Sequence, residues 1–204
     1  MDDPFYRDNE LRALALTHCD YTFEREFEIC KTKSNYPLCF DGLDTFCDIY
    51  LNGKHISCTD GMHIRYELTV TDVLKDGKNT VKVVCHSVHE YTEKKHNQLS
   101  LYNSPHSLPG FAYIRKAHCM MGWDWGPYLP DMGIWHPVYL LEKDSARITE
   151  FHIPQRHENG RVFVTPTVKT DVPTAIKIAV KNPSGEKIFL SANTESEITN
   201  PALR

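Results

Sequence analysis

The residues best suited to chemistry lie in one stretch, MMGWDWGPYLPDMGIWHPV, at residues 120–138. It holds all three tryptophans of the chain, and two of them flank an acid in the run Trp123, Asp124, Trp125. A carboxylate can accept hydrogen bonds from two vicinal hydroxyls, and an indole offers a flat apolar face that suits a sugar ring. The same residue types also serve as core anchors and a salt-bridge partner. The stretch therefore predicts either a carbohydrate-binding surface or a packed core element.

Three histidines, His86, His89 and His96, lie close together in sequence beside Cys85 and raise the question of a metal site. Structural zinc needs four ligands at short, defined spacings. Cys85 and His86 would point to opposite faces of a strand, and no second ligand pair completes a tetrahedron. The sequence also lacks a G-x-S-x-G elbow, an H-E-x-x-H pair and a glycine-rich phosphate loop. We therefore expect no metal site and no cofactor.

Composition narrows the class of protein. The net charge is -4 and the basic residues are scattered, so no nucleic-acid partner is expected. The apolar runs are too short to span a bilayer, so no membrane contact is expected. The seven cysteines are odd in number and form no C-x-x-C pair, which is typical of reduced, buried thiols in a cytoplasmic protein.

The elements that must position the aromatic stretch are mainly strands, because period-two alternation dominates. Residues 21–30 place Phe23 and Phe27 on one face, and residues 45–51 alternate in the same way. Asn52-Gly53 predicts a type I′ hairpin with its return strand at 54–56. Residues 90–133 form a long connection in which only 111–117 (FAYIRKA) is expected to be a strand.

After residue 143 the pattern changes to short hairpins, one about Asn159-Gly160 and another turning at residues 182–185. Their regular spacing is typical of an immunoglobulin-type sandwich. Only about five strands are expected in residues 143–204, whereas such a sandwich takes about seven in ~100 residues. The second domain is therefore expected to be incomplete.

Several segments together resemble glycoside hydrolase family 2, and its β-mannosidase branch in particular. Residues 3–10 (DPFYRDNE) resemble the segment after the first strand of that family's N-terminal domain, and residues 40–53 (FDGLDTFCDIYLNG) resemble its sugar-binding-domain motif. Residues 111–140 look like the β-mannosidase signature. Its Trp-Asp-Trp-Gly-Pro run separates mannosidases from galactosidase, glucuronidase and exo-glucosaminidase relatives.

The resemblance implies an all-β chain: a jelly-roll sugar-binding domain over residues 1–142, then part of an immunoglobulin-like β-sandwich over 143–204. In this family a (β/α)8 barrel of ~250 residues holds the two catalytic glutamates. We therefore assign no catalytic residue and expect the chain alone to be inactive. The jelly roll would contribute binding of a terminal β-mannoside, with Asp124 hydrogen-bonded to sugar hydroxyls and Trp123 and Trp125 as pocket walls. Trp135 is expected in the core.

Relatives carry a strand before the segment at 3–10 and continue beyond residue 201, so both ends of the chain are expected to be trimmed. A jelly roll that lacks a strand exposes a sheet edge, which invites pairing with another chain. A homo-oligomer is therefore one expectation. Two other functions stay open: a different family 2 glycosidase (β-galactosidase, β-glucuronidase or exo-β-glucosaminidase), or a free-standing carbohydrate-binding module. A purely structural scaffold is the third.

Overall fold

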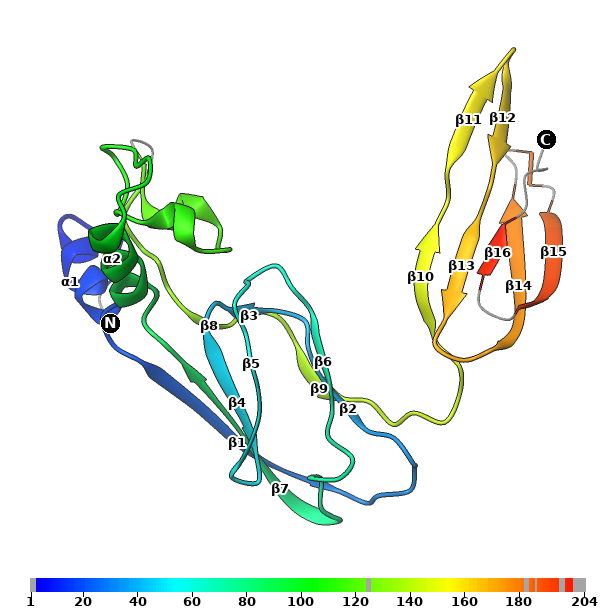
Figure 1. The fold of residues 1–204 in the computed structure, drawn as a ribbon, viewed down its shortest axis with the longest axis horizontal. Coiled ribbons are helices and arrows are strands. Elements are labelled where there is room, and N and C mark those ends of the chain that lie inside the picture. Colours follow the sequence, from blue (N-terminus) through cyan, green and yellow to red (C-terminus); the bar gives the residue numbers. More distant parts are fainter. Residues whose placement is uncertain (1–2, 124–125, 182–183, 186, 195–196, 200–204) are drawn as a thin grey trace. The chain divides into compact units, whose positions relative to one another are not determined.

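A computed structural model describes residues 3–123, 126–181, 184–185, 187–194 and 197–199. The chain divides into two compact units, residues 1–143 and residues 144–204. Strands are the main regular structure of each unit, and their ladders are antiparallel (Figure 1). The chain is all-β, as predicted.

Two facing sheets and a two-stranded ribbon form unit 1. One sheet has the strand order β1-β7-β4-β5, the second has the order β6-β2-β9, and the ribbon pairs β3 with β8. The strands are β1 (Tyr21–Ile29), β2 (Pro37–Phe40), β3 (Leu43–Asp44), β4 (Cys47–Leu51), β5 (Lys54–Cys58), β6 (Tyr66–Thr69), β7 (Gly77–Cys85), β8 (Gly133–Ile134) and β9 (Val138–Leu140). This is the predicted jelly-roll sandwich, with sheets that do not close on one another.

The hairpin between β4 and β5 shows how local sequence sets this fold. Asn52 and Gly53 both have positive φ, 53° and 81°, as a type I′ turn requires, so the predicted turn is confirmed. Along β4 the alternation also holds, since Cys47, Ile49 and Leu51 are buried while the residues between them are partly exposed. These side chains face the core, which is completed from the other strands and connections by Tyr36, Leu38, Phe40, Leu43, Val70, Leu74, Val83 and Cys85.

β1 and β9 are edge strands of the two sheets in the described part of the chain. Between them lies a groove of about 500 Å³ that is lined largely by apolar side chains of both sheets. Phe23 is 40% exposed because it faces this groove instead of a covered core. Self-association through the open edges stays a prediction.

Two helices lie outside the sandwich, α1 (Asn9–Leu16) and α2 (Val88–Gln98). Ser87 is the N-cap of α2, and its Oγ accepts a hydrogen bond from the Glu90 backbone N–H. Ser87 and Glu90 have the spacing of a capping box, a signal for a helix start that the alternating pattern through residue 88 obscured. No helix in the described residues is long and apolar enough to cross a bilayer.

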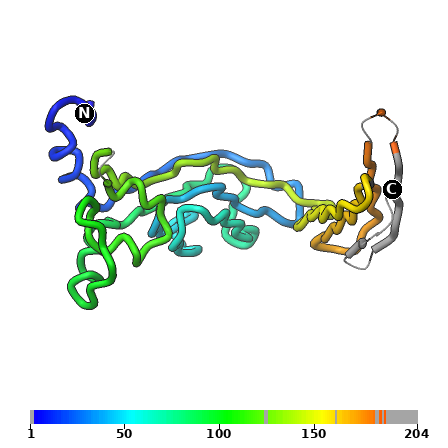
Figure 2. Tube along the Cα trace, turned by 90° about the horizontal axis from the view of Figure 1, so that it is seen from above, coloured from blue at the N-terminus to red at the C-terminus, as the bar shows by residue number. Residues whose placement is uncertain are grey.

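The predicted strand at residues 111–117 is wrong. Phe111–Tyr113 forms a short 3-10 helix, η1, and only Arg115 makes an isolated bridge, with Gly61. η1 starts at Gly110, whose φ of 82° and close approach to the Thr92 carbonyl are open only to glycine. A second 3-10 helix, η2 (His118–Met121), leads into the aromatic stretch. The ribbon of Figure 1 and the tube of Figure 2 place the segment with α1 and the segment with α2 at one end of unit 1.

The cysteines are less buried than expected. Cys39, Cys47 and Cys85 are buried, but Cys19, Cys30, Cys58 and Cys119 are exposed. The exposed ones lie at or beyond strand ends or in η2, where apolar neighbours in sequence do not imply cover by a second layer.

Unit 2 contains seven short strands in its described residues, more than the five expected. They are β10 (Ile148–His152), β11 (Gln155–Glu158), β12 (Arg161–Val164), β13 (Thr167–Thr170), β14 (Thr174–Lys181), β15 (Lys187–Thr194) and β16 (Glu197–Thr199). They pair as β10-β13-β16, β11-β12 and β14-β15. The β11–β12 turn has positive φ at Asn159 and Gly160, as predicted. Val168 and Ile178 are the buried residues of its hydrophobic core, and the incompleteness of this domain stays a prediction.

Candidate functional site

The loop considered as the site covers residues 117–130, which include η2 and the first part of the aromatic stretch, and Trp123 is the one predicted sugar-binding residue that the structure describes. Asp124 and Trp125, the other two predicted sugar-binding residues, lie outside the described residues. Trp123 forms an antiparallel bridge with Gly126 and is partly buried. It lines a cavity of about 220 Å³ together with Ser107, Phe111, His118, Cys119 and Gly122. The loop thus presents one indole to a small, partly aromatic cavity.

The backbone on both sides of this turn is held by packing and hydrogen bonds. Met121 is fully buried, and its carbonyl accepts a hydrogen bond from the Leu108 amide at 2.7 Å. The Leu129 amide donates to the Met120 carbonyl at 3.1 Å, which ties the outgoing strand of the loop to the incoming one. Gly122 has a φ of 90°, and an added Cβ would lie 2.1 Å from Cδ1 of Tyr128. The close contact between this backbone and Tyr128 therefore requires glycine.

A buried ion pair lies where the two ends of the loop meet. The Lys116 side chain has no exposed surface, and it contacts the carboxylate of Asp44, whose side chain is 4% exposed. The Lys116 ammonium group also donates to the backbone carbonyl of Asp131 at 2.6 Å. The Asp44 carboxylate accepts a further hydrogen bond from the Thr45 hydroxyl. Every member of this cluster has a partner, which is what a buried ion pair needs in order to persist.

The pairing of β3 with β8 sets the position of Asp44 in the ion pair with Lys116. Leu43 pairs with Ile134 and Asp44 pairs with Gly133, so the Gly-Leu-Asp-Thr segment lies beside the residues that follow the loop. Leu43 points into the core and is fully buried. Asp44 therefore has a fixed position next to Lys116, which directly precedes the loop.

The carboxyl groups of Asp44 and Asp131 are not the catalytic acid pair of a glycosidase. A retaining glycosidase needs a protonated acid and an ionised nucleophile ~5–5.5 Å apart on either side of the sugar. The protein atoms packed around the Asp131 carboxyl group raise its pKa, and the Asp44 carboxylate adds to this effect while Lys116 opposes it. Asp44, however, is buried and bound to Lys116, so no sugar can reach it.

Trp135 is not a core residue, and that prediction is wrong. It is 44% exposed, and its Nε1 donates to the Met62 carbonyl at 3.2 Å. Its indole covers Gly42 so closely that a Cβ there would lie 2.5 Å from Nε1. Trp135 lies between β8 and β9, where the alternation of a strand no longer decides which way a side chain points.

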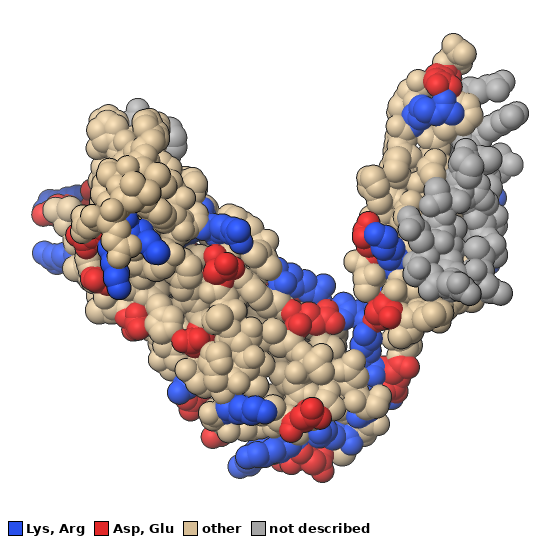
Figure 3. Space-filling model, in the orientation of Figure 1, with Lys and Arg blue, Asp and Glu red and all other residues tan. Residues whose placement is uncertain are grey.

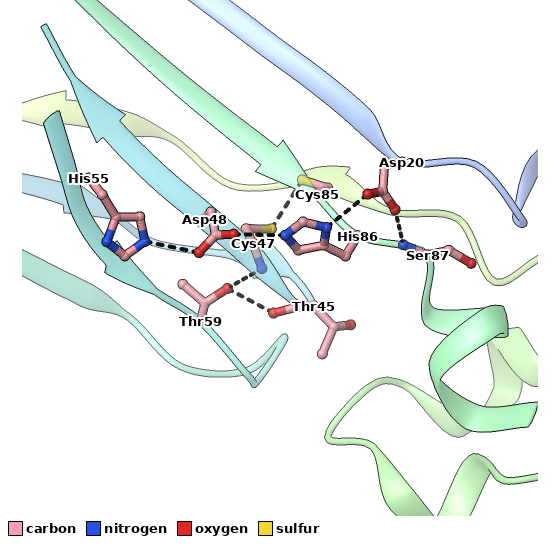
Figure 4. Close-up of polar contacts among 9 residues, drawn as sticks. All are labelled: Asp20, Thr45, Cys47, Asp48, His55, Thr59, Cys85, His86 and Ser87. Atoms are coloured by element: carbon pink, nitrogen blue, oxygen red, sulfur yellow. Dashed lines mark hydrogen bonds and ion pairs between the residues drawn. The ribbon is translucent and has the colours of Figure 1, made fainter. Parts of the chain in front are cut away.

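A second polar cluster runs along the surface of the first sheet (Figure 4). The His86 ring bridges two carboxylates, with Nδ1 2.9 Å from Asp20 and Nε2 2.9 Å from Asp48. His55 contacts the other Asp48 oxygen at 2.9 Å. Hydrogen bonds with Asp48 and Asp20 raise the pKa of His86, and the His86 ring in turn lowers the pKa of both carboxyl groups.

The histidines considered for a metal site are used in other ways. His89 is buried and its Nδ1 lies 2.9 Å from the Thr17 hydroxyl, while His96 contacts Ser100. Within the described residues, no group of three or more His, Cys, Asp or Glu side chains is arranged to hold a metal ion. Acidic and basic side chains are interspersed over the face of unit 1 drawn in Figure 3.

Comparison with known protein families identifies the family to which this β-sandwich belongs. Residues 1–136 match the model of the glycosyl hydrolase 2 galactose-binding domain-like family. The chain belongs to glycoside hydrolase family 2. The resemblance stated from its sequence motifs is confirmed.

Relatives of this family 2 chain point to one branch of the family. It is 35% identical to the β-mannosidase of Rattus norvegicus over 170 residues, which is 78% of this chain and 19% of that protein. It is 32% identical to β-mannosidase B of Emericella nidulans, over 83% of this chain and 21% of the relative. The solved β-D-mannosidase of Dictyoglomus thermophilum superposes with a TM-score of 0.83 at 28% identity, over 98% of this chain and 26% of that one. The chain thus spans about a fifth of the curated relatives.

Sequence reasoning missed the Lys116–Asp44 pair and the His86 cluster of this family 2 domain. Asp44 was part of a quoted motif, and Lys116 was part of the quoted mannosidase signature, yet neither received a role. The two residues are 72 positions apart, so no local pattern relates them. No local signal singled them out, because the first motif contains three charged residues and the second contains four.

Proposed function

We propose that this chain is the N-terminal, non-catalytic part of a retaining exo-glycosidase that hydrolyses terminal β-D-mannose residues. The catalytic (β/α)8 barrel and its two glutamates would lie in the rest of the full-length polypeptide. The observation that carries the proposal is the match to the Dictyoglomus thermophilum β-D-mannosidase over 98% of the chain. The identity of 35% to a mammalian β-mannosidase supports the same substrate.

We assign the loop at residues 117–130 to the sugar pocket. In this proposal Asp124 accepts hydrogen bonds from sugar hydroxyls, while Trp123 and Trp125 form apolar walls. The partly buried Trp123 beside a small cavity is consistent with a wall that is completed by another domain. Since the chain would supply only this wall, it would not hydrolyse a glycoside by itself.

The test is an assay of the full-length protein with p-nitrophenyl β-D-mannoside against the corresponding β-galactoside, β-glucuronide and β-glucosaminide. We expect β-mannoside to be hydrolysed with by far the highest kcat/KM. Preference for any of the other three would overturn the proposed substrate. No activity on any of the four substrates would overturn the proposed enzyme class. A purely structural scaffold would then be the remaining hypothesis.

The loop assignment has its own test in the same protein. Asp124→Ala should lower kcat/KM for β-mannoside by about 100-fold or more, because hydrogen bonds to sugar hydroxyls strengthen in the transition state. Asp72→Ala is the matched control: this exposed carboxylate lies in the connection before β7, far along the chain from the loop. Equal activity of the two variants would remove Asp124 from the sugar site.

A free-standing carbohydrate-binding module predicts a different result for the isolated 204-residue chain. All three tryptophans lie in or just after the loop, so their fluorescence reports on the proposed pocket. We expect no saturable change on titration with mannose or manno-oligosaccharides, since one wall does not make a pocket. Saturable binding in the millimolar range or tighter would favour the module.

A further inference from the structure

One amino group joins the two ends of the loop at residues 117–130. Lys116 is the residue just before the loop, and Asp131 is the residue just after it. The Lys116 ammonium group donates to the Asp131 carbonyl at 2.6 Å, so a single hydrogen bond closes the loop at its base. The described part of the loop is thereby bounded at both ends by one hydrogen bond, whose donor side chain is fully buried.

The ammonium group is itself fixed from a third segment. Asp44 contacts it from β3, and the Thr45 hydroxyl holds the same carboxylate. β3 belongs to the frame of the sandwich, because Leu43 beside Asp44 is fully buried in the core. The base of the loop is therefore attached to the core through a charge that has no access to water.

We propose that Lys116, oriented by Asp44, is the positioning residue of this loop and sets where its sugar-contacting side chains lie. This rests on the proposed function of the loop in sugar binding. Lys116 does not touch the sugar: its side chain is fully buried and both of its partners are protein groups. Its effect on binding passes through the Asp131 backbone and the hydrogen bond between Leu129 and Met120.

A buried pair suits this role better than an apolar contact would. A hydrogen bond from an ammonium group is directional, and the buried Lys116 and Asp44 side chains have almost no contact with water as an alternative partner, which restricts the geometry of the ammonium group. An apolar side chain at position 116 would fill the space but would allow the two ends of the loop to slide. Errors of about 1 Å in positioning are enough to lower the efficiency of an enzyme by roughly 100-fold.

The experiment uses the full-length protein and the double variant Lys116→Met/Asp44→Asn. Replacing both charges avoids an unpaired buried ion, so the fold should survive. The Asn amide oxygen can still accept from Thr45, but the donor to the Asp131 carbonyl is lost. We expect the inhibition constant of D-mannose as a competitive inhibitor to rise by roughly 10- to 100-fold. This constant does not depend on the fraction of enzyme that is folded.

Asn79→Ala is the matched control for a merely structural effect. Asn79 is a buried side chain with several hydrogen bonds, to Asn52, Lys75 and Gly77. It lies six positions from Cys85 along β7, roughly 20 Å from the end of the strand near Asp44. This variant should lower the melting temperature but leave the inhibition constant unchanged. An unchanged constant in the double variant, or an equal rise in both variants, would overturn the proposal.

Hydrogen exchange on the same proteins separates this proposal from the proposed function. The amides of Leu108 and Leu129 should exchange faster in the double variant than in the wild type, and not in Asn79→Ala. If the wild type hydrolyses no β-mannoside, the proposed function fails, but this exchange pattern still supports the positioning role of Lys116. If these amides keep wild-type protection in the folded double variant, the positioning role is wrong, whatever the enzyme hydrolyses.

Discussion

Two polar clusters in unit 1 differ mainly in their contact with water. The Lys116–Asp44 pair has side chains 0% and 4% exposed, whereas the His86 side chain is 43% exposed and its partners Asp20 and Asp48 are 54% and 30% exposed. Both clusters join segments that are far apart in the chain. Only the buried one lacks water as an alternative partner.

This difference decides what each cluster can do. Removing one member of a buried pair leaves an uncompensated charge, so the arrangement is held strongly even though forming it brings little net stability. Exposed pairs contribute a median of about 0–1 kcal/mol and are screened by salt. The buried cluster is thus suited to fixing the loop, and the exposed cluster is suited to responding to pH.

The largest expected effect is that of breaking the buried pair on one side. Lys116→Met alone leaves Asp44 charged and buried, and should lower the free energy of unfolding of unit 1 by about 3–5 kcal/mol. Urea unfolding followed by tryptophan fluorescence measures this, because all three tryptophans belong to unit 1. The double variant with Asp44→Asn should recover part of the loss. A single variant as stable as the double one would mean that the pair is not desolvated.

Asn79→Ala separates burial from charge. Asn79 is 2% exposed but neutral, and its removal leaves the Lys75 amide and carbonyl without their partner. We expect the free energy of unfolding to fall by about 1–3 kcal/mol in the same experiment. This loss lies between those expected for the buried and the exposed charged cluster. A loss as large as that of Lys116→Met would show that burial alone, without charge, sets the scale.

His86→Gln should have a smaller and pH-dependent effect. The folded state raises the pKa of His86, so its contribution is fully present below the ordinary value of 6.5 and is lost as pH rises through the folded value. The pKa values of Asp20 and Asp48 are lowered, so these two carboxylates stabilise the fold above pH 3.8, and this stabilisation is lost as pH falls well below 3.8. The variant should therefore lose no more than about 1 kcal/mol at pH 5.5 and less at pH 9. A loss that grows from pH 5.5 to pH 9 contradicts the assignment.

His55→Ala tests the outermost contact and should have the smallest effect. The His55 side chain is 51% exposed and contacts only the Asp48 carboxylate among the ion pairs. We expect a change in unfolding free energy of about 0.2–0.5 kcal/mol at pH 5.5, which becomes smaller in 0.5 M salt, where only the edge-on contact of the His55 ring with Tyr50 remains to be lost. Asn79→Ala, measured in parallel, should keep its effect in salt because it involves no charge.

Much of unit 1 could be predicted because its strands follow simple local rules. The alternation at Cys47, Ile49 and Leu51 assigned the buried face of β4, and Asn52-Gly53 assigned the turn after it. The prediction failed where local rules compete: a capping box at Ser87 ended an alternating run, and the positive φ of Gly110 began a 3-10 helix within an expected strand. The positions of Asp124 and Trp125 stay predictions from the resemblance.

The sequence alone was sufficient for the all-β class, the two hairpin turns with positive φ and the membership of family 2. These depend on side-chain alternation, glycine and asparagine conformations, and short motifs, which are all properties of neighbouring residues. Only the tertiary structure brought Lys116 to Asp44 across 72 positions and left Trp135 44% exposed. Periodicity says which side chains share a face, but which segment covers that face is decided by long-range packing.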